Sequence, residues 1–315
     1  MVRNIKLNDG KSIPAVAWGN GTGGLSAAGK KAVDTGALAL REGIRHIDTA
    51  QSYRTEEETG LAIKAAGADR KAVFQQQHPD HPEGIKSSVT DSISKLGFIP
   101  DLLLIHSPFV PAHGKIAVFW QILESLVEDG TLKGASLGVS NFRPQDLEEV
   151  LKIAKIKPVV NLQSFPEFSS PGLHLKELEY HPYVLNHLDP VLAIQAKHGI
   201  VSESYGPLTP LLRHPTGGPL KPVLQRIAQR LSKDTGKPVD DATVLLLWTV
   251  QKGVVAVTTS GNPDNIKKLV EVDSLPDLTD AELKEIEEVG RKVHFRHYKE
   301  HMTKDFPEPD LPQDV

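Results

Sequence analysis

The stretch GIRHIDTAQSY, residues 43–53, is followed closely by an acidic run, EEE, at 56–58. Three β-prone residues after a glycine predict a short strand that ends where the polar residues begin. The acidic run predicts the first turn of a helix that ends near Gly67, because carboxylates there interact favourably with the helix dipole. We therefore predict that Asp48 and Tyr53 lie on the loop between a strand and a helix.

In a parallel α/β protein, a loop of this kind belongs to the face that carries active sites. The Asp48 carboxylate could hold a cation or a hydroxyl group in place, and the Tyr53 phenol could act as a general acid once its pKa is lowered. The alternative is that Asp48 caps the helix and Tyr53 packs against it. Spacing alone leaves both interpretations open.

Two longer segments resemble a known family. The run GIRHIDTAQSYRTEEETGLAIK, residues 43–64, resembles the first signature of the aldo-keto reductases, and GTLKGASLGVSNF, residues 130–142, resembles the second. The sequence VTTS at 257–260 is most similar to the fungal branch of conjugated polyketone and α-keto amide reductases. The resemblance extends from Ile13 to about Phe306. It implies an α/β fold, a (β/α)8 TIM barrel with a C-terminal tail over the active-site face, and NAD(P)H-dependent carbonyl reduction.

Composition agrees with a small-molecule enzyme. The 315 residues include 36 basic and 40 acidic side chains, a net charge of −4, which gives no reason to expect nucleic acid or a membrane as partner. With 0 Cys there is no disulfide framework and no thiolate metal site, and we expect no metal. No signal peptide is recognisable at the N-terminus. We expect a cytoplasmic protein, a monomer or weak dimer.

Alternating strand and helix patterns run through the chain. Residues 5–8 and 12–16 flank Asp9-Gly10, a strong hairpin signal, and the hairpin is expected to plug the barrel floor. Residues 30–41 read as the first helix of the alternation. No linker separates two halves, so we expect one domain over 1–315. Besides the strand before Asp48, barrel strands are predicted at 17–19, from 73, and at 101–106, 136–139, 158–161, 199–204 and 254–258.

His106 ends the predicted strand 101–106, a nearly unbroken apolar run. In general, a histidine at the end of a buried strand is more often a core residue than a catalytic one. The sequence IHSP at 105–108 resembles the family's histidine motif, which implies that His106 orients the substrate carbonyl.

The resemblance also implies a set of cofactor contacts. Ser140 and Asn141 would bind the nicotinamide carboxamide, although the same residues could cap a helix beginning near Pro144. Tyr205 would stack on the nicotinamide ring, although it could simply pack in its loop. A helix after Ser260, capped by Ser260 or Asn262, would offer its amides to the 2′-phosphate of NADP. The full implied set is Gly21, Thr22, Asp48, Ser140, Asn141, Tyr205, Gly206, Leu208, Thr259, Ser260 and Asn265.

Three departures from the family pattern limit what the resemblance implies. The catalytic lysine position is held by His78, after three glutamines that are poor sequence for a buried strand, since each amide must find a partner. Residues 162–177 form an insertion, predicted to be a loop without a barrel role, which displaces the usual carboxamide glutamine and leaves Gln163 as a substitute. Asn265 stands where many NADPH-dependent relatives have arginine, and Lys267 and Lys268 could compensate.

The leading hypothesis is an NADPH-dependent reductase of aldehydes or activated ketones, with NADH possible. Tyr53 is the general acid, and Asp48, His106 and His78 complete the catalytic set. A rival is a cofactor-binding barrel with little or no catalysis, because the lysine is absent. A (β/α)8 hydrolase is a third reading, but it needs paired carboxylates or a metal cluster, and the sequence indicates neither. Aromatic residues in the tail at 294–307 could cover the substrate pocket or brace the barrel wall.

Overall fold

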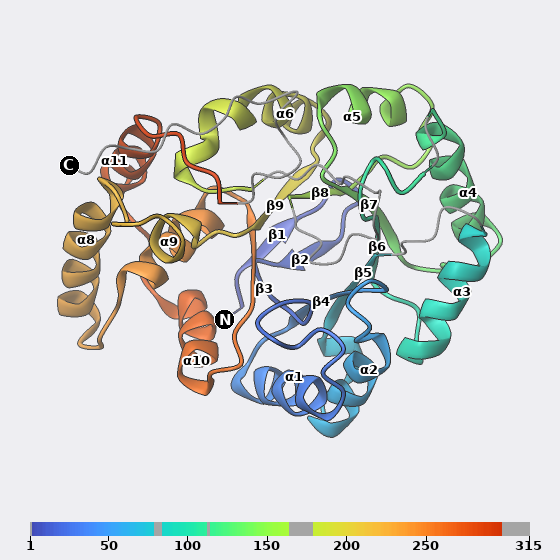
Figure 1. The fold of residues 1–315 in the computed structure, drawn as a ribbon, viewed down its shortest axis with the longest axis horizontal. Coiled ribbons are helices and arrows are strands. Elements are labelled where there is room, and N and C mark those ends of the chain that lie inside the picture. The colour runs from blue at the N-terminus through green and yellow to red at the C-terminus, as the bar shows by residue number, and fades with distance from the viewer. Residues whose placement is uncertain (1, 79–83, 112–113, 164–178, 298–315) are drawn as a thin grey trace.

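The structure, a computed structural model, describes residues 2–78, 84–111, 114–163 and 179–297. Eight parallel strands close into a barrel in the order β10-β3-β4-β5-β6-β7-β8-β9, and the hairpin β1-β2 forms a separate sheet. Figure 1 looks along the barrel, with the strands at the centre and the helices in a ring around them. The predicted TIM barrel with an N-terminal hairpin is therefore confirmed.

The barrel strands have four or five residues each. The predicted sixth and seventh strands each begin two residues later than expected, at Val160 and Val201. Pro158 has no N–H to pair, and Gly199 terminates the preceding helix in a left-handed conformation with φ of 67°. The strands are β3 (Val16–Gly19), β4 (His46–Ala50), β5 (Phe74–His78), β6 (Leu102–Ile105), β7 (Ser136–Ser140), β8 (Val160–Gln163), β9 (Val201–Tyr205) and β10 (Val255–Thr258).

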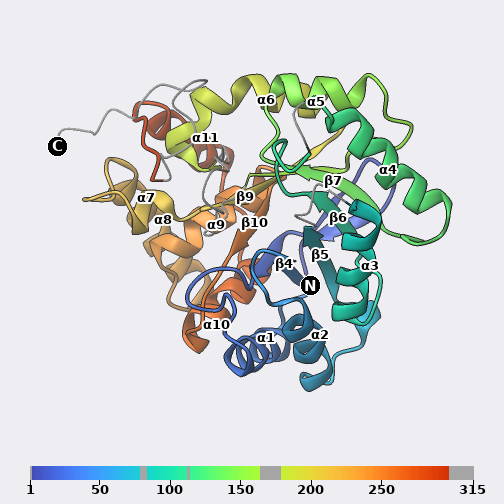
Figure 2. The ribbon, with the colours of Figure 1, turned by 45° about the vertical axis from the view of Figure 1, so that its right-hand side comes forward.

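Helices follow the strands around the outside of the barrel, as Figure 2 shows from a second direction. The predicted helix at 30–41 is present as the first of them. Three short 3-10 turns lie at Arg70–Ala72, Pro182–Val184 and Val272–Ser274. The α-helices are α1 (Lys30–Glu42), α2 (Glu56–Ala65), α3 (Ile85–Leu96), α4 (Ile116–Glu128), α5 (Pro144–Leu151), α6 (Leu185–His198), α7 (Thr209–Leu212), α8 (Leu220–Thr235), α9 (Asp241–Gln251), α10 (Pro263–Glu271) and α11 (Asp280–Gly290).

Side chains alternate along each strand, so one set points into the barrel and the other faces the helices. Leu103, Ile105 and Val139 belong to the large apolar cluster between strands and helices. Leu102 and Leu104, from the same strand β6, belong to a second cluster inside the barrel. The inner cluster also contains residues from β3, β8 and β10: Ala17, Val160, Leu162, Val255 and Val257.

The hairpin of β1 (Asn4–Lys6) and β2 (Ser12–Pro14) closes the barrel floor, as predicted. Ile13 is fully buried in the inner cluster. Ser136 Oγ, at the start of β7, donates a hydrogen bond of 2.6 Å to Asp9 Oδ2 in the hairpin turn. Asn8 Nδ2 donates to the carbonyl of Pro158, 2.8 Å away and just before β8. These contacts place the hairpin at the amino ends of the strands.

The N-terminal segment also contacts the chain just after α10. The Arg3 backbone N–H donates to Asp273 Oδ1 at 3.1 Å, and its guanidinium donates to the carbonyl of Leu275 and to Asp277 Oδ1, each at 2.6 Å. In the barrel itself, β3 pairs with β10, so that Val16 lies opposite Ala256. The barrel is therefore closed by its first and last strands.

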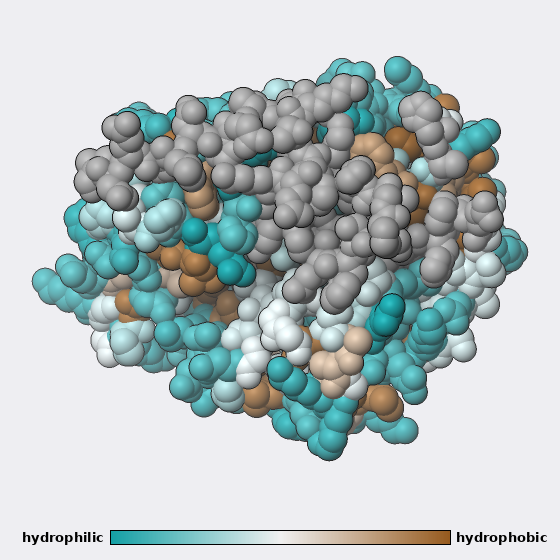
Figure 3. Space-filling view, in the orientation of Figure 1, coloured by the Kyte–Doolittle hydropathy of each residue, from teal (hydrophilic) through white to brown (hydrophobic). Residues whose placement is uncertain are grey.

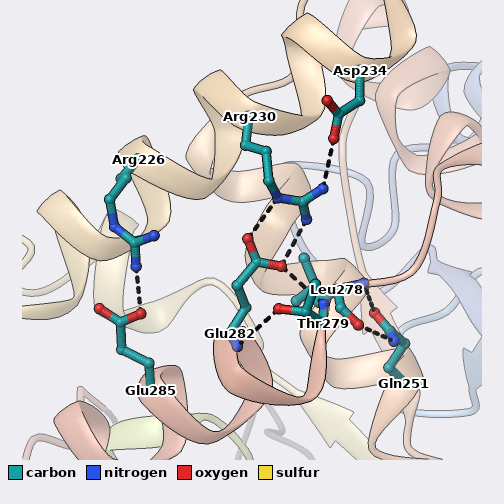
Figure 4. Close-up of polar contacts among 8 residues, drawn as sticks. All are labelled: Arg226, Arg230, Asp234, Gln251, Leu278, Thr279, Glu282 and Glu285. Atoms are coloured by element: carbon teal, nitrogen blue, oxygen red, sulfur yellow. Dashed lines mark hydrogen bonds and ion pairs between the residues drawn. The ribbon is translucent and has the colours of Figure 1, made fainter.

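Polar contacts fasten α11 to α8 on the outside of the barrel (Figure 4). Arg230 on α8 donates two hydrogen bonds to the Glu282 carboxylate, at 2.6 and 2.7 Å, and Arg226 pairs with Glu285. Thr279 accepts a hydrogen bond from the Glu282 N–H and completes a capping box at the start of α11. These contacts hold α8 and α11 together in the ring of helices.

Hydrophilic side chains predominate around the rim of the face shown in Figure 3. Exposed large apolar residues in the described ranges are scattered, and Leu212 is the most exposed at 68%. No helix among the described residues is both long enough and apolar enough to cross a membrane.

Candidate active site

Asp48 lies inside β4 and not on the loop after it, so the predicted position is wrong. The strand continues because residues 48–50 pair in parallel register with 76–78 of β5. The Asp48 carboxylate is buried and accepts a hydrogen bond of 3.0 Å at Oδ1 from Gln76 Nε2. The alternative role of capping α2 is also wrong, because Thr55 is the N-cap residue of that helix.

Tyr53 lies on the turn between β4 and α2, as predicted. Its carbonyl accepts hydrogen bonds from the Ala27 N–H at 2.9 Å and from Ser26 Oγ at 3.0 Å, which fix the turn. Its buried ring meets the His106 ring edge-on, with centroids 5.8 Å apart and planes at 82°. Two predicted catalytic side chains, from the segments that follow β4 and β6, therefore meet.

Gly21, in the glycine-rich loop after β3, lies directly against the Tyr53 ring. A Cβ added at Gly21 would lie 2.5 Å from the ring atoms Cδ2 and Cε2 of Tyr53, far inside van der Waals contact. Only glycine allows this approach of the loop to the tyrosine. The loop thus acts as one side of the slot that holds the Tyr53 ring.

His106 directly follows β6 and is 2% exposed. Its carbonyl accepts a hydrogen bond of 3.1 Å from Asn141 Nδ2, which also donates to Ser140 Oγ at 2.9 Å. Asn141 has a φ of 63°, a left-handed conformation that asparagine tolerates. The alternative that Ser140 and Asn141 cap α5 is wrong, since Arg143 and Asp146 form its capping box.

A cavity of about 120 Å³ lies beside these residues, at the carboxyl ends of β3, β4, β9 and β10. Leu212 and Arg213, which the sequence did not single out, lie on its wall. Among the predicted residues whose side chains are described, five are not in its lining: His106, Ser140, Asn141, Ser260 and Asn265; the side chain of His78 lies outside the described part of the structure. The predicted residues that line it are Gly21, Thr22, Asp48, Tyr53, Tyr205, Gly206, Leu208 and Thr259.

The predicted phosphate site lies where α10 begins. Asn262 is the N-cap residue, because its Oδ1 accepts the Asp264 N–H at 2.8 Å, and Ser260 Oγ accepts the Asn262 N–H at 3.1 Å. Asn265 is exposed in the first turn of α10. Lys268 forms an ion pair of 2.7 Å with Asp240. Lys267 is exposed on the same helix.

The three glutamines of β5 are fully buried, and each amide donates a hydrogen bond. Gln75 donates to the carbonyl of Gln76, Gln76 donates to Asp48, and Gln77 donates to Glu56 Oε1 at 2.7 Å. The expectation that each amide must find a partner or cost free energy is met for the three Nε2 donors, whereas Gln75 Oε1 is buried with no hydrogen-bond partner among the described residues, which costs free energy. His78 is the last residue of the strand and pairs in register with Ala50.

The barrel interior contains polar groups that the sequence did not reveal. His46 on β4 and Glu203 on β9 are both fully buried. Burial lowers the pKa of His46 to about 4, while burial, reinforced by the charge of Asp48, raises the pKa of Glu203 to about 8. The structure thus pairs two carboxylates, Asp48 and Glu203, where the sequence indicated none. Glu203 has no place in the cavity lining, so the pair does not flank a substrate as a hydrolase requires.

The structure describes only part of the predicted insertion and of the C-terminal tail. The loop expected at 162–177 begins too early, because Leu162 and Gln163 end β8, and Leu162 pairs with Ser140 and Glu203. The rest of that insertion lies outside the described residues. The tail is described to His297, and there Phe295 is buried and its ring lies 4.8 Å from His214. Its first residues therefore brace the protein, and 298–315 lie outside the described residues.

No three or more His, Asp and Glu side chains in the described ranges are grouped so as to hold a metal ion. The Tyr53 phenol and the Asp48 carboxylate line the cavity, and the His106 imidazole lies behind them against the Tyr53 ring. A phenol held beside an imidazole can protonate a carbonyl oxygen.

Comparison with known proteins agrees with this chemistry. The profile of the aldo/keto reductase family matches residues 17–291. The NAD/NADP-dependent indole-3-acetaldehyde reductase of Schizosaccharomyces pombe is 34% identical over 302 residues, 93% of this chain and 97% of that protein. The NADPH-dependent alpha-keto amide reductase of Saccharomyces cerevisiae is 31% identical over 300 residues, 90% of this chain and 89% of that protein. An aldo/keto reductase structure from Brucella melitensis has a TM-score of 0.73 at 29% identity, over 92% of this chain and 100% of that chain. This chain belongs to the aldo/keto reductase family.

Proposed function

We propose that this protein reduces aldehydes or activated ketones, such as α-keto lactones, α-keto amides or diones, to alcohols with NADPH. The observation that carries the proposal is the edge-on contact of Tyr53 with His106 next to the cavity that Asp48 lines. A phenol and an imidazole held together at a cleft suit a reaction in which a carbonyl oxygen gains a proton. The names of the two fungal relatives support carbonyl compounds as the substrate class.

Each residue then has a distinct role. The Tyr53 O–H donates its proton to the carbonyl oxygen as that oxygen gains negative charge. His106 lies beside the phenol and orients the same oxygen by a hydrogen bond. Asp48 is not in direct contact with substrate in this proposal, and it orders the polar groups beneath Tyr53 through its hydrogen bond with Gln76.

The residues around the cavity fit a nicotinamide dinucleotide. Gly21 and Gly206 leave room for a ligand along the walls, Tyr205 offers an aromatic face, and the N-terminus of α10 offers backbone N–H groups to a phosphate. When bound, NADPH supplies the hydride that the carbonyl carbon accepts. We propose that NADPH binds more tightly than NADH, because the N-terminus of α10 and Lys267 favour the extra phosphate.

A cofactor-binding barrel with little or no catalysis is the second candidate. It is favoured by one observation: β5 ends in His78 at the position where the family resemblance places the catalytic lysine. The deciding experiment measures NADPH consumption with a generic aldehyde, together with NADPH binding by fluorescence quenching. Binding without consumption would select this second candidate, and consumption would select the reductase.

A substitution at His78 tests the role of the missing lysine. An ammonium group beside a phenol lowers its pKa, whereas a histidine with an ordinary pKa near 6.5 is mostly neutral at pH 7. His78→Lys should therefore raise turnover at pH 7 at least about tenfold, or roughly 1.4 kcal/mol of barrier. A second version should also replace Gln76 and Gln77 by threonine, to restore the family's sequence before the lysine. Unchanged turnover in both, with NADPH binding retained, would show that His78 does not occupy the lysine site.

A further inference from the structure

Glu203 on β9 points into the barrel and has a relative exposure of 0%. Its partners in the neighbouring strands are Leu162 on β8 and Val255 on β10, both apolar. Neither oxygen of its carboxylate has a hydrogen-bond partner in the part of the chain that the structure describes. An ionised carboxylate in such a place would be desolvated with little to replace the water it loses.

The other titratable groups that face Glu203 come from β4. Asp48 raises the pKa of Glu203 by its negative charge, and His46 lies in the same interior. Described inward residues of β3, β6, β8 and β10 in the inner cluster are all apolar, and none is lysine or arginine. Among the described side chains, those that act on Glu203 are the Asp48 carboxylate and the Gln76 amide, and neither is positively charged.

His46 cannot neutralise the second charge. Its Nδ1 lies 3.2 Å from the carbonyl of Pro14, which can only accept a hydrogen bond, so Nδ1 carries the ring proton. Burial lowers the pKa of His46 to about 4, so the ring is neutral near pH 7. Its Nε2 then presents a lone pair and has no hydrogen-bond partner among the described residues.

Two carboxyl groups in one apolar interior do not both ionise, because each charge opposes the other. The hydrogen bonds decide which of them keeps the proton. Gln76 Nε2 donates to Asp48 Oδ1 at 3.0 Å, which stabilises the ionised form of Asp48. The Gln76 side chain also lowers the pKa of Glu203, against the larger effect of burial, but no hydrogen bond of normal length from a described residue reaches either Glu203 oxygen, and Glu203 is the more deeply buried of the two. The proton therefore belongs on Glu203.

We propose that Glu203 is a buried residue that holds a proton and thereby controls the charge near Tyr53. While Glu203 is protonated, Asp48 is the one charged carboxylate of the pair beneath Tyr53. Ionisation of Glu203 slows carbonyl reduction at alkaline pH. The second half of this proposal rests on the proposed reductase function. A second negative charge near Asp48 makes phenolate formation at Tyr53 less favourable, so Tyr53 becomes a weaker acid. Glu203 acts through Asp48 and Gln76 and does not touch the substrate.

Infrared spectroscopy on the protein with isotopically labelled glutamate tests the proton site directly. The parent should show the carbonyl stretch of a protonated carboxylic acid at about pH 6, and the band should disappear as the pH rises past about 8, the pKa to which burial raises Glu203. The loss of a band between about pH 6 and pH 9 should be absent in Glu203→Gln. A parent spectrum without this band at about pH 6 overturns the proposal, and this measurement needs neither turnover nor a folded variant.

The pH profile of aldehyde reduction tests the functional half. One pH unit above its pKa, about a tenth of Glu203 stays protonated, so kcat/KM of the parent should fall about tenfold between about pH 7 and pH 9. Glu203→Gln mimics the protonated form and should lose less than about twofold over that range. A parallel fall in both proteins overturns the role of Glu203 in the reaction.

Glu124→Gln is the matched control. Glu124 is also buried, but it lies on α4 and accepts hydrogen bonds from the backbone N–H groups of Lys155 and Ile156, at 2.7 and 2.8 Å. This variant should keep the alkaline fall of the parent. If the parent binds NADPH and reduces no aldehyde at any pH, the reductase proposal fails, while the infrared band still decides whether Glu203 holds a proton.

Discussion

Substituting Gly21 by alanine would act on the general acid without touching its side chain. The added Cβ would lie 2.5 Å from Cδ2 and Cε2 and 2.6 Å from Cγ of the Tyr53 ring, while ordinary contact begins at 3.4 Å. The ring or the loop must therefore move by about 1 Å, and neither is the free end of a flexible side chain. Misplacing a catalytic group by about that distance costs about 100-fold in rate. Relieving the overlap by distorting the surrounding structure costs about 1–3 kcal/mol of stability.

We expect Gly21→Ala to lower kcat for a generic aldehyde by about 100-fold and the free energy of unfolding by about 1–3 kcal/mol. The assays are steady-state NADPH consumption and urea denaturation. Gly261→Ala is the control for stability, because its Cβ would have no heavy atom within 4 Å, and it should change stability by less than about 0.5 kcal/mol. Parental kcat in Gly21→Ala, with unchanged stability, would refute the account of Gly21 as one side of a slot for Tyr53.

Two further predictions concern stability and cofactor choice. Burial raises the pKa of Glu203 from the ordinary 4.5 to about 8 in the folded protein, so its contribution to stability is fully present below pH 4.5 and is lost, by up to about 5 kcal/mol, as the pH rises to 8. Urea midpoints should show this loss in the parent and not in Glu203→Gln. The pKa of His46 is lowered by burial from 6.5 to about 4, so its effect on stability has the opposite direction. Its contribution to the free energy of unfolding, up to about 3 kcal/mol, is present above pH 6.5 and is lost as the pH falls to 4. Asn265→Arg should increase the affinity for NADPH about tenfold, or roughly 1.4 kcal/mol, through a guanidinium–phosphate pair, and should leave the affinity for NADH unchanged. Fluorescence quenching measures both affinities. An equal gain for both cofactors would contradict the phosphate site at α10.

The barrel could be predicted because its signals are local. Apolar runs such as 101–106 predict buried parallel strands, Asp9-Gly10 predicts a hairpin, and the turn of Tyr53 follows from the polar residues before an acidic helix start. The predicted ends of several strands differ by one or two residues from the observed ends, because backbone hydrogen bonds between strands decide where a strand stops. Asp48 looks like a loop residue by type, yet its backbone pairs with β5 and its carboxylate finds the Gln76 amide.

The interior network could not be predicted because its members are distant in sequence and face one another only across the closed barrel. Glu203 carried a weak signal, a charged residue at an inward position of the strand that ends at Tyr205. The sequence alone does not favour Gln76 in a strand. Its hydrogen-bond partner Asp48 is set by the register between β4 and β5 and not by the neighbours of Gln76 in sequence. The sequence suggests Lys268 as a substitute for the missing arginine, and only the position of Asp240 in the fold shows that Lys268 forms an ion pair.

The closure of the barrel floor constrains how this chain can fold during synthesis. The hydrogen bond between Arg3 and Asp273 joins residues 270 positions apart in sequence, and β3 has an unpaired edge until β10 is synthesised. Contacts of such large sequence separation form late, because the intervening chain must first be ordered. Until then the early strands expose an unpaired edge of the kind that promotes aggregation. Nearly the whole chain must therefore leave the ribosome before that edge of the first barrel strand is paired.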